Sequence, residues 1–189
     1  MATFHVPTRD QVSAQNQQLF DNLQKGLGFV PNLYATFGLS DNGLGAYLAF
    51  QQSQTKGAFK AKEREAINLV VSQANNCVYC QAAHTALGKM NGFTDGQILQ
   101  LRAGYADFDP KLDALVKLAK AITQTKGHPA SELVDNFVAI GYAQNAVVDL
   151  VLMVGDKIIS NYLHSITQIP VDFPAAPVLQ TADTEVIIA

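Results

Sequence analysis

Apolar residues recur every three or four positions along most of this chain of 189 residues, which is the spacing of one face of an α-helix. The pattern is clearest between residues 61 and 74, where Ile67 and Val70 share a face. Valine-rich runs at 69–71 and 147–154 have strand propensity, but both lie inside longer stretches of helical period with few turn residues. The pattern therefore predicts helices rather than a sheet.

Residues that typically begin or end helices divide this pattern into separate elements. A short apolar element spans residues 30–37, and prolines at 170, 174 and 177 keep the chain extended after the last helix. The sequence predicts an all-α fold of about eight helices, with an extended, proline-containing C-terminal tail at about 170–189. The expected helices cover approximately residues 8–24, 41–54, 61–74, 77–90, 94–102, 109–127, 131–140 and 145–167.

The length of the chain suits one domain. Hydrophobic residues make up 48% of the sequence, which is enough for a sizeable core. No internal repeat or low-complexity segment is evident. We therefore interpret residues 1–189 as a single helical domain, with the motif-bearing core at about 40–125.

Charged residues are sparse and nearly balanced, with 13 Lys and Arg against 16 Asp and Glu. No basic block appears, so we expect no nucleic-acid partner. No apolar run approaches about 18 residues, so we expect no membrane span. The N-terminus lacks the pattern of a signal peptide, and we expect a cytoplasmic location. Because only 15% of the residues are charged, the surface has limited charge to cover it, and we expect a homo-oligomer.

Both cysteines of the chain, Cys77 and Cys80, fall in one CxxC motif, and His84 follows three residues after it. If a helix starts at the motif, these side chains lie at i, i+3 and i+7 on one face. Two cysteines in a single CxxC do not make the disulfide framework of a secreted protein. In a reducing compartment this spacing is typical of a redox-active or metal-binding site.

The position of Cys80 favours thiolate chemistry. A helix N-terminus and a neighbouring base can lower a cysteine pKa from about 8.5 to about 3.5–7.5, and histidine can take and return a proton at cellular pH. The Cys80 thiolate would attack a peroxide oxygen and become a sulfenic acid, which Cys77 would convert to a disulfide. A dithiol donor would then reopen that disulfide. Because some redox folds attack with the first cysteine, the order of the two sulfurs stays open.

A carboxylate from the preceding helix is the other candidate group. Glu65 lies twelve residues before Cys77, on a helix joined to the motif by the short link Asn75-Asn76. Asparagine tolerates the left-handed conformation and caps helices, so this link is expected to fold the two helices against each other. Periodicity alone does not distinguish Glu65 from Glu63, because both border the apolar stripe.

Other interpretations of the motif remain open. The two cysteines can be inert buried thiols, or zinc ligands together with His84 and a fourth group. The protein can be a non-catalytic redox sensor, or a lyase that uses Glu65 and His84 as acid and base. His164, on the long apolar C-terminal helix, is interpreted as a core or interface residue or as part of a pocket. No glycine-rich nucleotide-binding run or serine nucleophile elbow is present.

The four candidate residues follow the pattern Glu-x11-Cys-x2-Cys-x3-His. This pattern resembles that of the AhpD-like alkylhydroperoxidase branch of the carboxymuconolactone decarboxylase family, and it matches at every one of the four positions. The segments 30–34, 82–87 and 161–164 resemble the peroxidase-related subgroup of that family. The resemblance extends over roughly residues 10–174.

The resemblance implies an AhpD-like helical fold, peroxidase activity, and assembly into dimers, trimers or hexamers. It implies that Cys80 is the peroxidatic cysteine, that Cys77 resolves it, and that Glu65 and His84 form a proton relay. The implied partners are a hydroperoxide substrate and a dithiol reductant, with no bound cofactor or metal. At one position the chain departs from the founding hydroperoxidases, since Tyr79 stands where they have a histidine. The CxxC itself favours the peroxidase branch over the decarboxylase branch.

Overall fold

The fold is entirely helical in residues 4–179, the part of the chain that the computed structural model describes. These residues form nine α-helices and one short 3-10 helix, and no strand occurs among them, which confirms the all-α prediction. The elements are η1 (Arg9–Gln11), α1 (Ala14–Leu27), α2 (Asn32–Phe37), α3 (Gly43–Gln54), α4 (Ala61–Ala74), α5 (Val78–Met90), α6 (Asp95–Ala103), α7 (Pro110–Gln124), α8 (Ser131–Ala139) and α9 (Asn145–Thr167).

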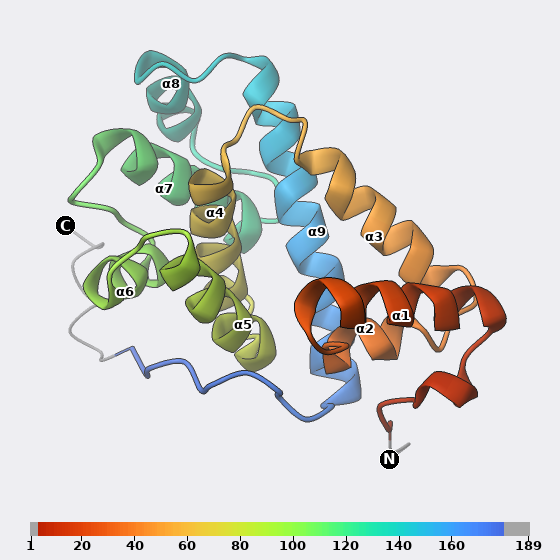
Figure 1. Ribbon diagram of the computed structural model, residues 1–189. Helices are drawn as coiled ribbons and strands as arrows, with labels where there is room; N and C mark the ends of the chain where they lie inside the picture. The colour runs from red at the N-terminus through yellow and green to blue at the C-terminus, as the bar shows by residue number, and fades with distance from the viewer. Residues whose placement is uncertain (1–3, 180–189) are drawn as a thin grey trace.

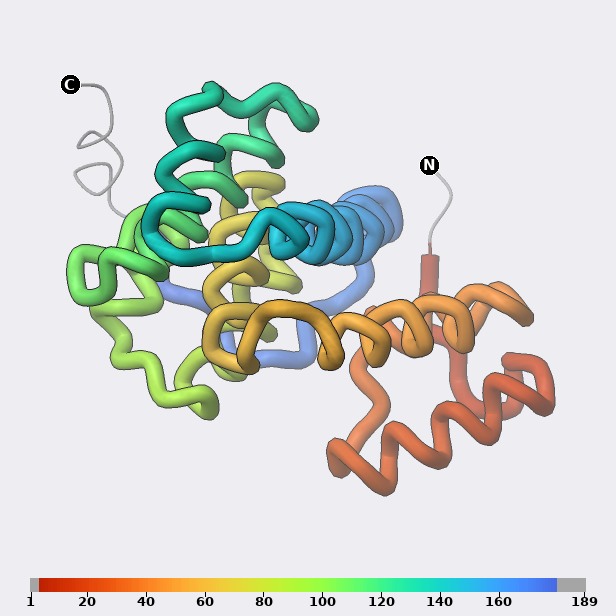
Figure 2. Tube along the Cα trace, turned by 90° about the horizontal axis from the view of Figure 1, so that it is seen from above, coloured from red at the N-terminus to blue at the C-terminus, as the bar shows by residue number. Residues whose placement is uncertain are grey.

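Helix α4 lies at the centre of the larger group of helices. It packs against α5, α6, α7 and α9, and α8 packs on α7 (Figure 1). Helices α1, α2 and α3 form a second group on the other side of α9, as both views show (Figures 1 and 2). The long helix α9 therefore stands between the two groups and contacts both of them.

The centre of the larger group is a core of aliphatic side chains. Ile67, Leu69 and Val71 of α4 are completely buried, as are Leu115 and Leu150 from α7 and α9. Burying a side chain of this size stabilises the fold by about 1.5–3 kcal/mol relative to leaving it in water. The apolar stripe that predicted this helix is thus the surface on which the neighbouring helices assemble.

The turn between α4 and α5 has the conformation that its two asparagines predicted. Asn75 is the C-cap of α4, and Asn76 is in the left-handed region with φ of 53°. The Cys77 N–H then donates to the Ser72 carbonyl at 3.0 Å, which closes the end of α4. This tight turn places the start of α5 directly beside the end of α4.

The first predicted helix differs from the observed one in its bounds. The expected start near residue 8 is wrong, because Ser13 is an N-cap whose side chain accepts from the Asn16 N–H, so α1 begins at Ala14. The helix continues to Leu27 and ends at Gly28, whose φ of 85° is left-handed. The buried Asn16 ties α1 to the loop after α2 by donating to two backbone carbonyls, each at 2.9 Å.

The segment after α9 is extended and runs beneath the ends of α4, α5 and α6 (Figure 1). Its Asp172 carboxylate accepts from the Asn32 N–H at 2.7 Å, and its Pro177 carbonyl accepts from the Arg102 guanidinium at 2.6 Å. The segment therefore bridges α2 and α6. The prediction of an extended tail is confirmed as far as residue 179, and its remainder at 180–189 lies outside the described residues. The single-domain interpretation of residues 1–189 stays a prediction.

The length and polarity of the helices also bear on the expected absence of a membrane span. Of the helices found between residues 4 and 179, none combines the length and the apolar character needed to cross a bilayer.

Candidate active site

The CxxC motif lies at the N-terminal end of α5. Cys77 is the N-cap residue, and its sulfur accepts from the Cys80 N–H at 3.3 Å. The two sulfur atoms are 2.7 Å apart, and both cysteines are free. Cys77 is completely buried and Cys80 is 3% exposed. The turn therefore holds the two sulfurs in contact, with the backbone N–H groups of a helix start beside them.

The environment of the pair makes the two thiols unequal. The hydrogen bond from the Cys77 thiol lowers the pKa of Cys80 to about 6, with help from the charge of Lys157 and from His84, although burial opposes the shift. The same hydrogen bond, together with burial, raises the pKa of Cys77 above its ordinary value. Of the two sulfurs, Cys80 is therefore the one that more readily carries the negative charge of a thiolate, which is the nucleophilic form.

A chain of hydrogen bonds runs from α4 through α5 to α9. The Glu65 carboxylate is 2.8 Å from Nδ1 of His84, and Nε2 of His84 is 3.1 Å from Nζ of Lys157. An ammonium group can only donate, so Nε2 accepts from Lys157 and Nδ1–H donates to Glu65. The imidazole is thus neutral in this arrangement, with both nitrogens engaged.

The structure distinguishes the two glutamates that periodicity left equivalent. The Glu65 side chain is 13% exposed, lies beside His84 and also accepts from the Asn68 amide at 3.1 Å. Burial would raise the pKa of Glu65, but its interactions with His84, Lys157 and Asn68 bring it below its ordinary value. Glu63 points elsewhere and accepts from the Tyr142 hydroxyl at 2.9 Å. Only Glu65 belongs to the group around the motif.

Lys157 is a site residue that the sequence reasoning missed. Its side chain is 3% exposed, and its Nζ is 3.6 Å from the Asp156 carboxylate. Burial alone would lower the pKa of Lys157, but Tyr47, Asp156 and Cys80 raise it above the ordinary value, so the amine is charged. One signal was present in the sequence, since Lys157 is the only lysine or arginine after Lys126 and lies in a long apolar helix.

The described part of the chain contains no set of side chains arranged to bind zinc. Between residues 4 and 179, no three histidine, cysteine, aspartate or glutamate side chains are arranged to hold a metal ion. His84 is turned toward Glu65 and Lys157, so a metal at its Nε2 would face the Lys157 ammonium. The charge of that ammonium opposes a second cation at this position.

Tyr79 and His164 pack against each other, and Tyr79 also packs against the C-terminal segment. The Tyr79 hydroxyl accepts from the Leu33 N–H at 3.2 Å, and its ring packs on Phe173 and on His164. Burial raises the pKa of Tyr79 and lowers that of His164. His164 donates from Nε2 to the Ile169 carbonyl at 3.2 Å and is not among the residues that line the cavity described next. Both residues therefore hold the start of α5 in place.

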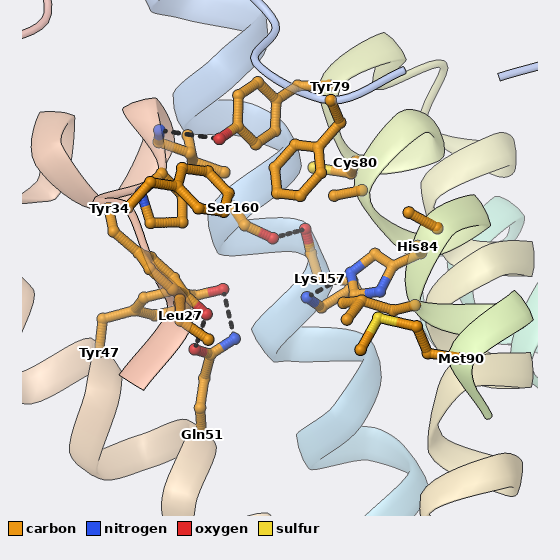
Figure 3. Close-up of a pocket in the computed structure, with 17 residues that line it drawn as sticks. Leu27, Tyr34, Tyr47, Gln51, Tyr79, Cys80, His84, Met90, Lys157 and Ser160 are labelled. Carbon is orange, nitrogen blue, oxygen red and sulfur yellow. Dashed lines mark hydrogen bonds between the residues drawn. The ribbon is translucent and has the colours of Figure 1, made fainter. Parts of the chain in front are cut away.

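A cavity of about 300 Å³ opens onto Cys80, His84 and Lys157. Helices α2 and α3 form one wall, α5 forms the opposite wall, and α9 lies between them (Figure 3). Cys77 is not part of its lining, which is mostly apolar and aromatic. The lining residues are Leu27, Phe29, Pro31, Leu33, Tyr34, Tyr47, Gln51, Tyr79, Cys80, Ala83, His84, Ala86, Leu87, Met90, Lys157, Ser160 and Phe173.

Comparison with solved structures identifies the same fold in several proteins. A peroxidase-related protein from Ralstonia eutropha JMP134, described as an alkylhydroperoxidase AhpD core, superposes with a TM-score of 0.78 at 20% identity, covering 96% of this chain and 93% of that one. A peroxidase-related protein from Silicibacter sp. TM1040 gives 0.76 at 22% identity, covering 95% and 92%. A cysteine-to-alanine variant of the debrominase Bmp8, in complex with 2,3,4-tribromopyrrole, gives 0.74 at 17% identity, covering 97% and 95%. At these identities the likeness establishes the fold.

Comparison of the sequence with known families gives a match over part of the chain. No curated protein matches it. Residues 44–124 match the model of the carboxymuconolactone decarboxylase family, and this segment contains Glu65, both cysteines and His84. Residues 44–124 are therefore similar to the carboxymuconolactone decarboxylase family, and the chain around them has an AhpD-like fold.

Proposed function

We propose that this protein is a thiol-dependent oxidoreductase that reduces hydroperoxides, with Cys80 as the attacking sulfur and Cys77 as the resolving sulfur. The observation that carries the proposal is the unequal position of the two cysteines. Cys80 lines the cavity with its pKa lowered to about 6, whereas Cys77 is fully buried behind it with its sulfur 2.7 Å away. A substrate in the cavity would meet the Cys80 sulfur first.

The proposed cycle transfers two electrons from a dithiol to the peroxide. The Cys80 thiolate attacks the terminal oxygen of ROOH, the O–O bond breaks, and RO⁻ takes a proton and leaves as ROH. Cys77 loses its proton and attacks the sulfenic acid sulfur of Cys80, the S–O bond breaks, and water leaves as the disulfide forms. A dithiol then reduces that disulfide by exchange and becomes a disulfide itself. The sum is ROOH plus dithiol giving ROH, water and oxidised dithiol.

The Lys157 ammonium, which donates a hydrogen bond to His84, is the proposed source of the proton that the leaving alkoxide needs. Both line the cavity beside Cys80, and they are joined to each other at 3.1 Å. Lys157 would recover a proton when the reduced Cys80 thiol ionises again at the start of the next cycle, while His84 and Glu65 hold the amine in place. In this scheme Glu65 orients the imidazole of His84, and Lys157 supplies the positive charge that acts on the reacting sulfur.

The burial of the sulfurs restricts the reductant that we propose. Cys80 is reached through the cavity and Cys77 is not exposed, so the dithiol must be a small molecule or a slender group that enters the cavity. A cytoplasmic location, where thiols are kept reduced, fits this requirement and belongs to the same proposal.

The lining of the cavity also favours a second class of substrate, which would accept the two electrons in place of the peroxide. Its aromatic walls suit a flat, apolar ring, and a neighbour of this fold is a debrominase. In such a reaction the Cys80 thiolate would take bromine from a ring carbon, that carbon would take a proton, and Cys77 would displace bromide to form the disulfide. The two electrons come from the same dithiol, so the cysteine roles are unchanged.

The test compares the two single cysteine variants. We expect Cys80→Ser to abolish consumption of cumene hydroperoxide in the presence of dithiothreitol. We expect Cys77→Ser to accumulate a sulfenic acid at Cys80 that dimedone traps, identified by mass spectrometry. Dimedone trapped at Cys77 in the Cys80→Ser variant, with peroxide still consumed, would reverse the assignment of the two sulfurs.

The alternative functions give different results in the same assay. A redox sensor would be oxidised once per chain and would show no repeated turnover with excess dithiol. A lyase that uses Glu65 and His84 would keep its turnover when both cysteines are replaced. Full activity of the double cysteine variant on a lactone or β-keto acid would therefore overturn the thiol proposal.

A further inference from the structure

Two asparagines from different helices meet beside the sulfur pair. Asn161 lies on α9, one turn after Lys157, and is completely buried. Asn75 is the C-cap of α4, two residues before Cys77. The Asn75 amide donates from Nδ2 to Oδ1 of Asn161 at 2.9 Å. This hydrogen bond fixes the plane of the Asn161 amide, so that its oxygen faces α4 and its NH₂ group faces away from Asn75.

The NH₂ group of Asn161 has no regular hydrogen-bond partner among residues 4–179, although it is buried. Leaving a buried donor unpaired costs about 1–3 kcal/mol, and native proteins contain few such groups. The contact with Asn75 holds this amide beside the turn that carries the CxxC motif, and its side-chain hydrogen bonding lowers the pKa of both Cys77 and Cys80, so the two sulfurs are the acceptors within its reach. A donor is therefore held in advance where negative charge develops on sulfur.

We propose that Asn161 is a positioning residue whose side-chain N–H groups donate to whichever of the two sulfurs carries the negative charge. This inference rests on the proposed thiolate chemistry at Cys80. Before the attack the charged sulfur is Cys80, and when the disulfide is reopened it is the sulfur that leaves. Because the amide faces both sulfurs, one fixed group serves both half-reactions. Lys157 supplies charge to the site, and Asn161 supplies a directed donor.

Other ionisable groups also face Cys80 and influence its titration. Cys77, Tyr79 and His84 approach from α5, and Lys157 approaches from α9. An Asn161 variant keeps all four of these groups in the sequence. A change in the titration of Cys80 in such a variant therefore reports the loss of the amide donor.

The experiment follows the thiolate absorbance at 240 nm against pH in the reduced protein. We expect the midpoint for Cys80 to rise by about one pH unit in Asn161→Ala, because a hydrogen bond to a charged group is lost. Asn161→Asp should raise the midpoint further, since a carboxylate would then face the thiolate. The matched control is Asn16→Ala, which removes another fully buried amide far from the sulfurs and should leave the midpoint unchanged.

A folded Asn161→Ala variant whose midpoint stays within a few tenths of a pH unit of wild type would overturn the inference. Should the variants fail to fold, the wild-type protein decides the question by NMR. The side-chain amide protons of Asn161 should move downfield with the same midpoint as the thiolate absorbance. Resonances that do not respond to that ionisation would equally reject the role of Asn161.

These readouts separate the inference from the proposed function. The absorbance and NMR titrations need no peroxide and no turnover. A shifted midpoint in a protein that reduces no peroxide would leave the Asn161 inference standing and remove the peroxidase. Peroxide reduction with an unshifted midpoint would do the reverse.

Discussion

Nζ of Lys157 lies 3.1 Å from Nε2 of His84, a contact between residues 73 positions apart in the chain. It occupies Nε2 of His84, the residue that the sequence analysis proposed as a base beside Cys80. His84 is therefore hydrogen-bonded to Glu65 on one side and to the buried ammonium of Lys157 on the other. The positive charge that lowers the pKa of Cys80 is that of Lys157.

Replacing Lys157 with methionine should destabilise the thiolate form of Cys80. An opposite charge close to a thiol shifts its pKa by about 1–3 units, so we expect the Cys80 midpoint to rise by about two units and the rate at pH 7 to fall about tenfold. Absorbance at 240 nm and kcat/KM for cumene hydroperoxide measure the two effects. The control is Lys120→Met, which removes a partly buried lysine bound to the Ala103 carbonyl. An unchanged midpoint in Lys157→Met would contradict the electrostatic role.

The rate of the first chemical step should follow the ionisation of Cys80. Since its pKa is lowered to about 6, the thiolate fraction grows about tenfold per pH unit below 6 and is nearly complete above 7. Single-turnover stopped-flow experiments without reductant should show a rising acid limb and a plateau. A limb centred near pH 8.5, the value of an ordinary thiol, would show that the environment does not activate Cys80.

Glu65→Gln should destabilise the protein at neutral pH by about 1.5–3 kcal/mol, the range for a hydrogen bond to a charged group. The folded pKa of Glu65 is below its ordinary value, so its contribution is complete above about pH 4.3 and is lost as the pH falls through the folded pKa. Urea unfolding at several pH values should therefore show the difference from wild type shrinking in acid.

The neighbouring glutamate serves as the matched control for that substitution. Glu63→Gln removes a carboxylate that accepts from Tyr142 outside the site, so peroxide turnover should stay near wild type. Turnover that fell equally in the Glu63 and Glu65 variants would show that the loss is one of folding and not of the relay.

Purified protein should contain no stoichiometric zinc. The imidazole of His84 is held between Glu65 and a charged lysine, which leaves the two sulfurs without a third ligand in the described part of the chain. Elemental analysis after extensive dialysis is the measurement. One zinc per chain, lost together with the fold on chelation, would restore the metal-binding interpretation.

The expected homo-oligomer has a candidate contact face on α9. Val148, Val151, Ile159 and Tyr162 are exposed apolar residues at helical spacing, on the side of α9 away from Lys157. We expect light scattering at micromolar concentration to give a multiple of the 20.4 kDa chain mass. The double variant V151K/I159K should reduce that mass, whereas Val178→Lys, at an exposed apolar position on the C-terminal segment, should not. A monomeric wild type would contradict the prediction.

The sequence by itself determined the helices and the place of the motif. The bounds of α4 and α9 agree with the periodicity, because a helical face is a property of neighbouring residues. Asn76 adopts the left-handed conformation expected of it, and Cys77 and Cys80 lie at a helix start, since turns and caps also depend on a few adjacent side chains. The predicted helix bounds were wrong mainly at residues 8–13, where the N-cap at Ser13 interrupts an otherwise continuous pattern of apolar residues.

Only the tertiary structure decided which side chains meet around the sulfurs. Glu63 and Glu65 border the same stripe, and only the packing of α4 against α5 directs Glu65 to His84. Lys157 and Asn161 are about 80 residues from the motif, and periodicity places them on the buried face of α9 without specifying what they face. Contacts of this kind depend on how separate helices pack, which no local pattern in the sequence encodes.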